Sequence, residues 1–111
     1  MSCYAPSALS REELDRLPGI SVVEFGTNWC GFCHAARPFI EAAFADYPDV
    51  KRFRIEDGKG LPLGRSFVVR EWPTLIFLAD GREVARVVRP DSTAPVTQAL
   101  AELVASNQSD G

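Results

Sequence analysis

The sequence has few cysteines, few basic clusters and no long apolar run, and each shortage excludes a class of protein. Three cysteines are too few, and odd in number, for a small fold held together by disulfides. No basic run is longer than Lys51-Arg52 and the net charge is −3, so nucleic acid is not an expected partner. No apolar run reaches the length that a membrane-spanning helix needs, so we expect no membrane partner.

The first residues also lack the signature of an export signal. Met1-Ser2-Cys3-Tyr4-Ala5-Pro6 shows no positive segment followed by an apolar one. We therefore expect a soluble, cytoplasmic protein. Its 111 residues fit a single domain over residues 1–111, with 1–9 and 106–111 as mobile ends. We expect a monomer, with Cys3 as an unpaired thiol near the N-terminus.

The most informative motif is a pair of cysteines two residues apart, in Trp29-Cys30-Gly31-Phe32-Cys33. An apolar run at 21–25 precedes it, and apolar residues at helical spacing follow it from Ala36 to Tyr47. The pair therefore lies at a predicted junction between a strand and a helix. In a sequence without an export signal, this context indicates redox chemistry. Half of a metal site and two inert core cysteines are the alternatives.

The periodicity of the sequence predicts an α/β fold. The predicted elements are, in order, a short helix at 10–17, a strand at 20–25, a helix after the cysteine pair, a strand at 50–56, an irregular helix at 61–69, strands at 74–78 and 84–88, and a final helix from about Pro95. A helix connects the first two strands, which should be parallel, whereas a Gly-bearing turn connects the last two, which should be antiparallel. We expect a central mixed sheet of four or five strands with helices on both faces.

A set of spaced features resembles the thioredoxin family over roughly residues 22–104. Glu24 stands where family members carry a buried acid, six residues before Cys30 of the cysteine motif at 29–33. Pro38 matches the proline that bends their long helix. The stretch 67–74 resembles the one that ends in their cis-proline and threonine, and Asp80-Gly81 matches the turn of their terminal hairpin. The resemblance implies the thioredoxin-like fold.

The sequence departs from the family pattern at several places, among them Glu71 and Trp72, which flank Pro73 differently. Phe32 stands where thioredoxins proper have proline, and Glu24 replaces their usual aspartate. Arg89-Pro90-Asp91 occupies the region where family members carry a glycine near the substrate groove. Membership in the family is indicated, whereas the subtype is left open.

The two cysteines are expected to have different roles. If Cys30 caps the helix, the unpaired N–H groups and the helix dipole favour its thiolate and lower its pKa from about 8.5 toward about 7. Cys30 is then the attacking nucleophile. Cys33, one turn further, should face the core and stay a thiol until it resolves the mixed disulfide by attacking Cys30.

Glu24 is a charged residue in an otherwise apolar strand. Burial should raise the pKa of a lone carboxyl, which would let Glu24 take the proton from Cys33 as a general base. An arginine on the adjacent strand, such as Arg52, would instead make Glu24 half of a structural ion pair. Both roles stay open.

The resemblance implies a substrate-binding surface around Cys30. In it, Trp72-Pro73-Thr74 forms a loop with a cis bond before Pro73, and that loop presents backbone groups to an extended substrate. Trp29, Gly31, Phe32 and Trp72 are expected around the dithiol, and ordinary packing is the alternative for the aromatic residues. His34, the only histidine, is expected to face solvent, and no metal site is expected.

Together these features predict a thiol–disulfide oxidoreductase that reduces disulfides in cytoplasmic protein clients through Cys30 and Cys33. The resemblance implies no bound cofactor, and electrons from a thioredoxin reductase that uses NADPH and flavin. A disulfide oxidase or isomerase is one alternative. A binding or scaffold module that does not need the dithiol is the other.

Overall fold

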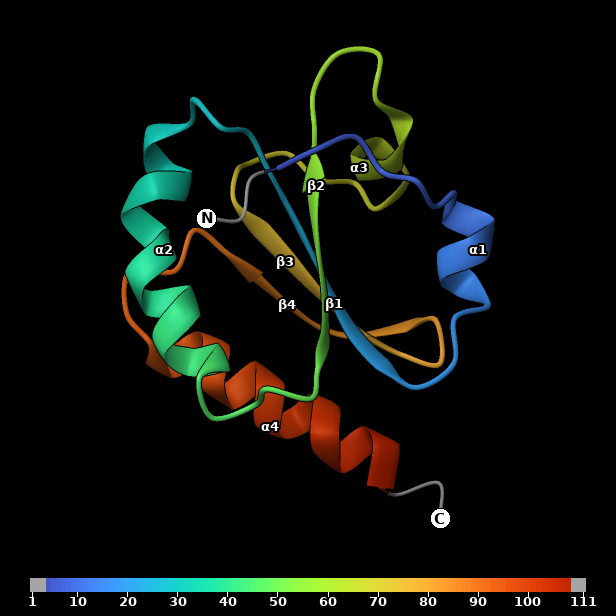
Figure 1. Cartoon of the computed structure of the whole chain (residues 1–111), viewed down its shortest axis with the longest axis vertical. Helices are drawn as coiled ribbons and strands as arrows, with labels where there is room; N and C mark the ends of the chain where they lie inside the picture. The colour runs from blue at the N-terminus through green and yellow to red at the C-terminus, as the bar shows by residue number, and fades with distance from the viewer. Residues whose placement is uncertain (1–3, 109–111) are drawn as a thin grey trace.

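The computed structural model describes residues 4–108 and shows a mixed four-stranded sheet between two pairs of helices (Figure 1). The elements are α1 (Arg11–Asp15), β1 (Ile20–Gly26), α2 (Gly31–Phe44), β2 (Lys51–Glu56), α3 (Pro62–Ser66), β3 (Thr74–Ala79), β4 (Arg82–Val88) and α4 (Ala94–Gln108). Every predicted helix and strand is present. The capping box that begins α1 is also confirmed, since Ser10 accepts from the Glu13 backbone and the Glu13 side chain accepts from that of Ser10.

The strands follow the spatial order β2-β1-β3-β4. As expected, β1 pairs with β2 in parallel through the α2 crossover, and β3 pairs with β4 antiparallel. β3 also pairs antiparallel with β1. A fifth strand does not form in the described residues. The extra pairing is an isolated parallel bridge between Ala5 and Ile55, on the outer side of β2.

The buried core is divided by the sheet into two clusters. One lies under α2 and α4 and includes Val22, Ile40, Leu100 and Leu103, while the other lies on the side of α1 and α3 and includes Phe25. Alternation along β1 sends Val22 to the first side and Phe25 to the second. Glu24, two residues after Val22, therefore points toward the side of α2, the helix that begins at the cysteine motif.

Both ends of the described chain differ from the mobile ends that we expected. Tyr4 is buried, and the Ala5 backbone bonds to Arg54 and Glu56 of β2. At the other end, α4 runs to Gln108, past the predicted end of order at residue 106. The N-terminal segment is held by its contacts with β2 and the core, although its sequence gives no periodic signal for a helix or strand. Residues 1–3, which include Cys3, and residues 109–111 lie outside the described part.

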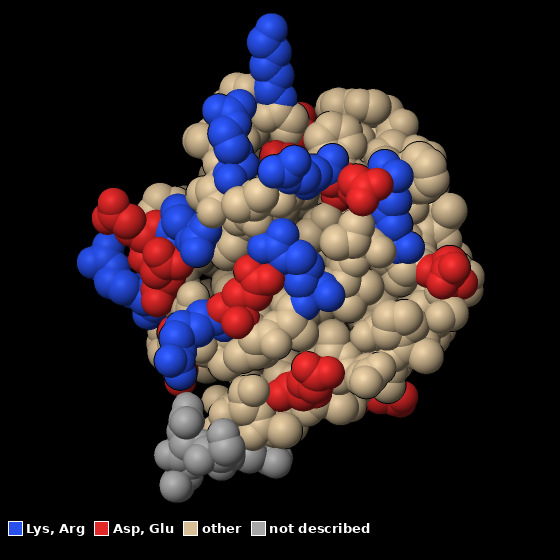
Figure 2. All heavy atoms as spheres, turned by 180° about the vertical axis from the view of Figure 1, so that it is seen from behind, with Lys and Arg blue, Asp and Glu red and all other residues tan. Residues whose placement is uncertain are grey.

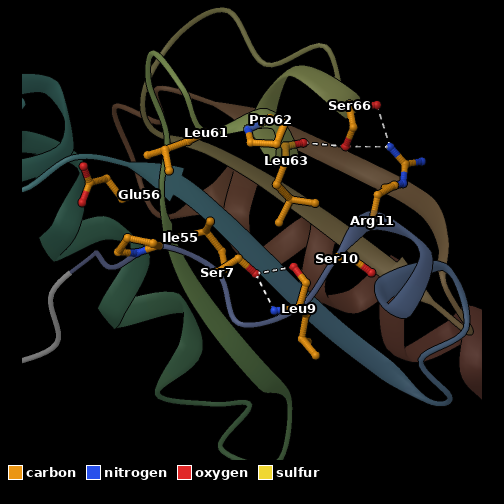
Figure 3. Close-up of a pocket in the computed structure, with 11 residues that line it drawn as sticks. Ser7, Leu9, Ser10, Arg11, Ile55, Glu56, Leu61, Pro62, Leu63 and Ser66 are labelled. Atoms are coloured by element: carbon orange, nitrogen blue, oxygen red, sulfur yellow. Dashed lines mark hydrogen bonds between the residues drawn. The ribbon is translucent and has the colours of Figure 1, made fainter.

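A pocket of about 250 Å³ lies where the N-terminal segment passes β2 and α3 (Figure 3). Leu9, Ile55, Leu61 and Leu63 are among the residues that line it. It shares no residue with the cysteine motif. On the face shown in Figure 2, basic and acidic side chains lie interleaved. No helix among residues 4–108 is long and apolar enough to cross a membrane.

Candidate redox site

Cys30 is the N-cap of α2, so its sulfur lies at the start of the helix. Its backbone is extended, with φ −86° and ψ 119°, and its Sγ accepts a hydrogen bond of 3.2 Å from the Cys33 N–H. The side chain is partly exposed. An unpaired backbone donor at a helix N-terminus stabilises negative charge on the acceptor. The Cys30 sulfur is therefore both hydrogen-bonded to the helix start and within reach of a substrate.

Cys33 lies one turn into α2 and is only 1% exposed. The pKa of its thiol is raised to about 12, mainly by burial and further by the hydrogen bond with Cys30, while a hydrogen bond with the Thr27 backbone acts in the opposite direction. Both Cys30 and Cys33 are free thiols in this structure. The two sulfurs thus have the surroundings expected of an attacking and a resolving cysteine.

The last residue of β1 has to be glycine because two side chains meet over its backbone. A Cβ atom on Gly26 would lie 2.7 Å from Cys33 Sγ and 2.7 Å from Tyr4 Cζ. Both distances are shorter than van der Waals contact, so any larger residue would displace one of the two groups. The absence of a side chain at Gly26 therefore lets the Tyr4 ring and the Cys33 sulfur lie next to each other.

Glu24 is 5% exposed and forms part of a buried network. Its Oε2 accepts a hydrogen bond from the Tyr4 hydroxyl. On the other side, its Oε1 lies 3.6 Å from Arg54 Nε and 3.9 Å from an Arg52 guanidinium nitrogen. Both arginines also bond Glu41 of α2. The general-base role of Glu24 stays a prediction.

Two arginines of β2, rather than one, lie beside Glu24. Arg52 is near its carboxylate as expected, and Arg54 lies opposite Glu24 in the strand register and closer to it. Both arginine side chains are largely covered, with 27% of Arg52 and 11% of Arg54 exposed. The reason is that α2 covers this side of β2 and provides Glu41 as a partner.

The loop before β3 lies next to the dithiol. The Trp72–Pro73 peptide bond is cis, as expected. The Trp72 carbonyl lies 4.0 Å from Cys30 Sγ, and the Thr74 hydroxyl donates to the Glu71 carbonyl at 2.6 Å. Trp72 is fixed by its indole N–H, which donates to Asp57 at 2.8 Å. The structure thus brings together Cys30 and a loop about 40 residues further along the chain.

Two large apolar side chains beside the cysteines face solvent. Trp29 is 71% exposed and Phe32 is 57% exposed, so neither packs in the core. Gly31 lies between them in sequence and is exposed, and a Cβ added there would meet no atom within 4 Å. Trp72 is half-buried. Exposed aromatic groups around a reactive sulfur suit the binding of an extended protein segment.

Arg89, directly after β4, crosses the same surface. Its guanidinium stacks on the Phe32 ring at 3.8 Å, and its Nε donates to the Trp72 carbonyl at 2.9 Å. A further bond of 3.1 Å joins it to Glu71. Its backbone has a positive φ of 47°, which suits the glycine that the family carries in this region. Arg89 thus links Phe32, beside the cysteines, to the loop before β3.

His34 is exposed, as expected, and its Nε2 lies 2.9 Å from the Asn28 carbonyl. No group of three or more residues of metal-binding type is placed to hold an ion in the part of the chain that the structure describes.

Sequence reasoning missed three residues of the site. Tyr4 lies in a segment that gives no periodic signal. Asp57 is an acidic residue in a loop after a strand, a common position that does not indicate a role in the site. Arg89 stands in a region that departs from the family pattern, which was the one available signal. All three contact residues at least 15 positions away in the sequence.

A partly exposed sulfur at a helix start, with a buried sulfur one turn behind it, is suited to alternate between dithiol and disulfide. Fold and site thus define a thiol–disulfide oxidoreductase. The family model for thioredoxin matches residues 10–102, and the chain belongs to the thioredoxin family.

Individual relatives agree with this assignment. The chain is 35% identical over 82 residues to a thioredoxin of Chlamydia pneumoniae, which covers 72% of this chain and 80% of that protein. It is 35% identical over 83 residues to thioredoxin-2 of Saccharomyces cerevisiae, with 75% and 79% covered. The solved structure of reduced thioredoxin 2 from Pseudomonas aeruginosa PAO1 is similar with a TM-score of 0.85 and 53% identity, over 95% of this chain and 97% of that one.

Proposed function

We propose that the chain, acting as one domain over residues 1–111, reduces disulfides in cytoplasmic protein clients through Cys30 and Cys33. The observation that carries the proposal is the asymmetry of the two sulfurs. Cys30 Sγ is partly exposed and accepts from the Cys33 N–H at 3.2 Å, while Cys33 is 1% exposed behind it.

The reaction has two exchange steps. The Cys30 thiolate attacks one sulfur of a client disulfide, the client S–S bond breaks, and one client thiolate leaves. Cys33 then loses its proton, with Glu24 proposed as the base, and attacks Cys30 in the mixed disulfide. The second client thiolate leaves as the Cys30–Cys33 disulfide forms. Two electrons pass from the protein to the client.

Client binding is assigned to the surface around Cys30. Trp29, Gly31 and Phe32 lie on one side of the sulfur, and the Trp72-Pro73-Thr74 loop lies on the other. An extended client segment would lie between them, with backbone hydrogen bonds to the loop.

The oxidised protein needs a source of two electrons for the next cycle. The resemblance to thioredoxins supports a reductase that uses NADPH and flavin, with no cofactor bound to this chain. We propose that the protein works as a monomer, since a single chain provides all the residues named here.

Trapping of clients tests the function. In a Cys3→Ser background, a Cys33→Ser variant should attack clients but not resolve, and so accumulate mixed disulfides that a reductant releases. The matched control is the Cys30→Ser/Cys33→Ser variant, which should trap none. Equal capture by both variants would favour a scaffold module. Trapping together with net oxidation of reduced clients by the wild-type disulfide form would favour an oxidase.

A further inference from the structure

Tyr4 is a buried titratable group that the two exchange steps do not use. It is 3% exposed and lies between the two groups that have to exchange a proton, Cys33 and Glu24. We propose that the Tyr4 hydroxyl is a proton relay, which carries the proton from the Cys33 thiol to the Glu24 carboxylate when Cys33 resolves the mixed disulfide.

The geometry places the hydroxyl between the donor and the acceptor. It donates a hydrogen bond to Glu24 Oε2. Its ring rests on Gly26, and Cys33 Sγ rests on the same glycine, each atom 2.7 Å from the position where a Cβ would be. Among the hydrogen bonds of residues 4–108, none joins Cys33 directly to Glu24. The phenol is hydrogen-bonded to Glu24, and its ring lies beside Cys33 Sγ at Gly26, so it is placed between the two groups.

The pKa values of Tyr4 and Cys33 also depend on each other. Burial is the main reason that the pKa of Tyr4 lies far above its ordinary value, and the neighbouring Glu24 and Cys33 add to it. The Tyr4 hydroxyl acts in the opposite direction on Cys33, where it lowers the pKa. A phenol that donates to the Cys33 thiolate thus stabilises the form that attacks.

A phenol suits this position because its oxygen both donates and accepts. In the transfer, the Cys33 S–H bond breaks and its proton goes to the Tyr4 oxygen, while the original Tyr4 proton goes to Glu24. Tyr4 stays neutral throughout, as its raised pKa requires. No electrons move in this step. The thiolate then attacks the sulfur of Cys30 as described above.

The charged and titratable groups around the relay come from β2 and from α2 with its N-cap. Arg52 and Arg54 of β2 lie beside the Glu24 carboxylate, and Glu41 of α2 binds both arginines. Cys30 lies on the other side of Cys33. These groups are unchanged when the Tyr4 hydroxyl is removed, so a Tyr4→Phe variant isolates the relay.

The relay serves the resolving step of the proposed function, and the test has to separate the two steps. A reduced Cys3→Ser protein is mixed with a peptide disulfide whose two thiols carry different fluorophores, so that attack and resolution give separate release phases. For Tyr4→Phe we expect an unchanged first phase. The second phase should slow at least tenfold, within the roughly 10²–10⁴-fold that general acid–base catalysis contributes.

Tyr47→Phe is the matched control, because Tyr47 is the other tyrosine of the chain and packs at the far end of α2. It should change neither phase. Equal slowing of both phases in Tyr4→Phe would overturn the relay. If the wild-type protein showed no first phase, both the proposed function and the relay would be overturned. If the first phase were normal and the second phase were equally fast in wild type and Tyr4→Phe, the relay alone would be overturned.

Two further readouts distinguish a relay from a structural role. First, Tyr4→Phe/Glu24→Gln should resolve no more slowly than the slower single variant, because both changes break one path. If the slowing factors of the two single variants multiplied in the double variant, Tyr4 and Glu24 would act independently, and the relay would be overturned. Second, hydroxide takes over deprotonation as the pH rises, so the difference between wild type and Tyr4→Phe should close in alkaline solution. A constant ratio would indicate a packing defect and overturn the relay.

Discussion

Cys30 and Cys33 are three residues apart but differ in access to solvent. Cys30 lies at the helix start, where its sulfur accepts from a backbone N–H, and a reagent can reach it. Cys33 is almost fully buried, and burial raises its pKa to about 12. The partly exposed Cys30 sulfur and the buried Cys33 sulfur are therefore only one helical turn apart.

Brief iodoacetamide treatment of the reduced protein near pH 7 should alkylate Cys30 and leave Cys33 unmodified. The reason is that alkylation needs an accessible thiolate, which Cys33 does not provide at this pH. Mass spectrometry of a Cys3→Ser protein checks the site of modification. If Cys33 were modified first, the assigned roles of the two cysteines would be reversed.

Arg89 limits access to the groove, since it occupies the Trp72 carbonyl and covers the Phe32 ring. A client that uses this carbonyl has to displace the guanidinium, and a cation–π contact at an exposed site is worth about 0.5–1 kcal/mol. Arg89→Ala should therefore raise the rate of protein-disulfide reduction by about two- to fivefold.

The comparison that isolates this effect uses a small disulfide, which does not need the groove. Its rate should stay nearly unchanged in Arg89→Ala. Arg82→Ala at the start of β4 is the control, because it removes the same charge at the opposite end of the strand. A loss of protein-disulfide reduction in Arg89→Ala would show that the arginine helps docking instead.

At the scale of elements, α3 helps to hold the loop before β3. Gly64 of α3 lies against the Asp57 carboxylate, which in turn accepts from the Trp72 indole at 2.8 Å. A methyl group at Gly64 would overlap that carboxylate. The short helix therefore needs glycine at this position, although glycine is a poor helix former.

Gly64→Ala should destabilise the protein by about 1–3 kcal/mol, the usual cost of overpacking. This loss outweighs the roughly 1 kcal/mol that alanine gains as a helix former. Urea unfolding measures the difference. Gly31→Ala is the control, because an added Cβ meets nothing there, and it should stay within about 0.5 kcal/mol of wild type. Similar stabilities of the two variants would contradict the overlap.

The ion network between α2 and β2 should give stability a dependence on acidic pH. The hydrogen bond from Arg52 holds the pKa of Glu41 below its ordinary value. A depressed carboxyl pKa stabilises the fold above the unfolded value of about 4.3, and that stability is lost as the pH falls through the folded value. The gain is at most about 1 kcal/mol because Glu41 is 45% exposed.

Glu41→Gln should therefore be less stable than wild type at pH 7, and this difference should shrink as the pH falls below about 4.3. Urea unfolding at several pH values checks it. Glu102→Gln, an exposed change on α4, should show no such trend. A difference that did not depend on pH would mean that packing, rather than charge, links Glu41 to β2.

The order of elements could be predicted because each one carries a local signal. β1 is an apolar run, α4 repeats apolar residues at helical spacing, and Asp80-Gly81 marks the hairpin. The contacts of Tyr4 and Arg89 gave no such signal, because they depend on side chains that meet across the sheet and across the groove. Local patterns predict elements, whereas long-range contacts arise only once the elements pack.

For the whole molecule, packing and redox chemistry are connected at Cys33. The buried thiol fills space beside Gly26 and Tyr4 and stays protonated there. Folding thus changes the proton affinity of the group that later has to give up a proton. A thiol that is easier to deprotonate in the unfolded chain makes the reduced fold less stable at high pH.

The last prediction concerns this alkaline limit. An unfolded thiol has a pKa of about 8.5, while that of folded Cys33 is raised to about 12. Because the folded state holds the proton more tightly, the stabilisation is complete below about pH 8.5 and is lost as the pH rises toward 12. The stability of the reduced wild type relative to a Cys33→Ser variant should therefore fall between pH 8.5 and 11, by up to about 1.4 kcal/mol per pH unit. Urea unfolding under excess phosphine reductant measures it, and other alkaline titrations largely cancel in the difference. A pH-independent difference would mean that Cys33 ionises in the folded protein as easily as in the unfolded chain.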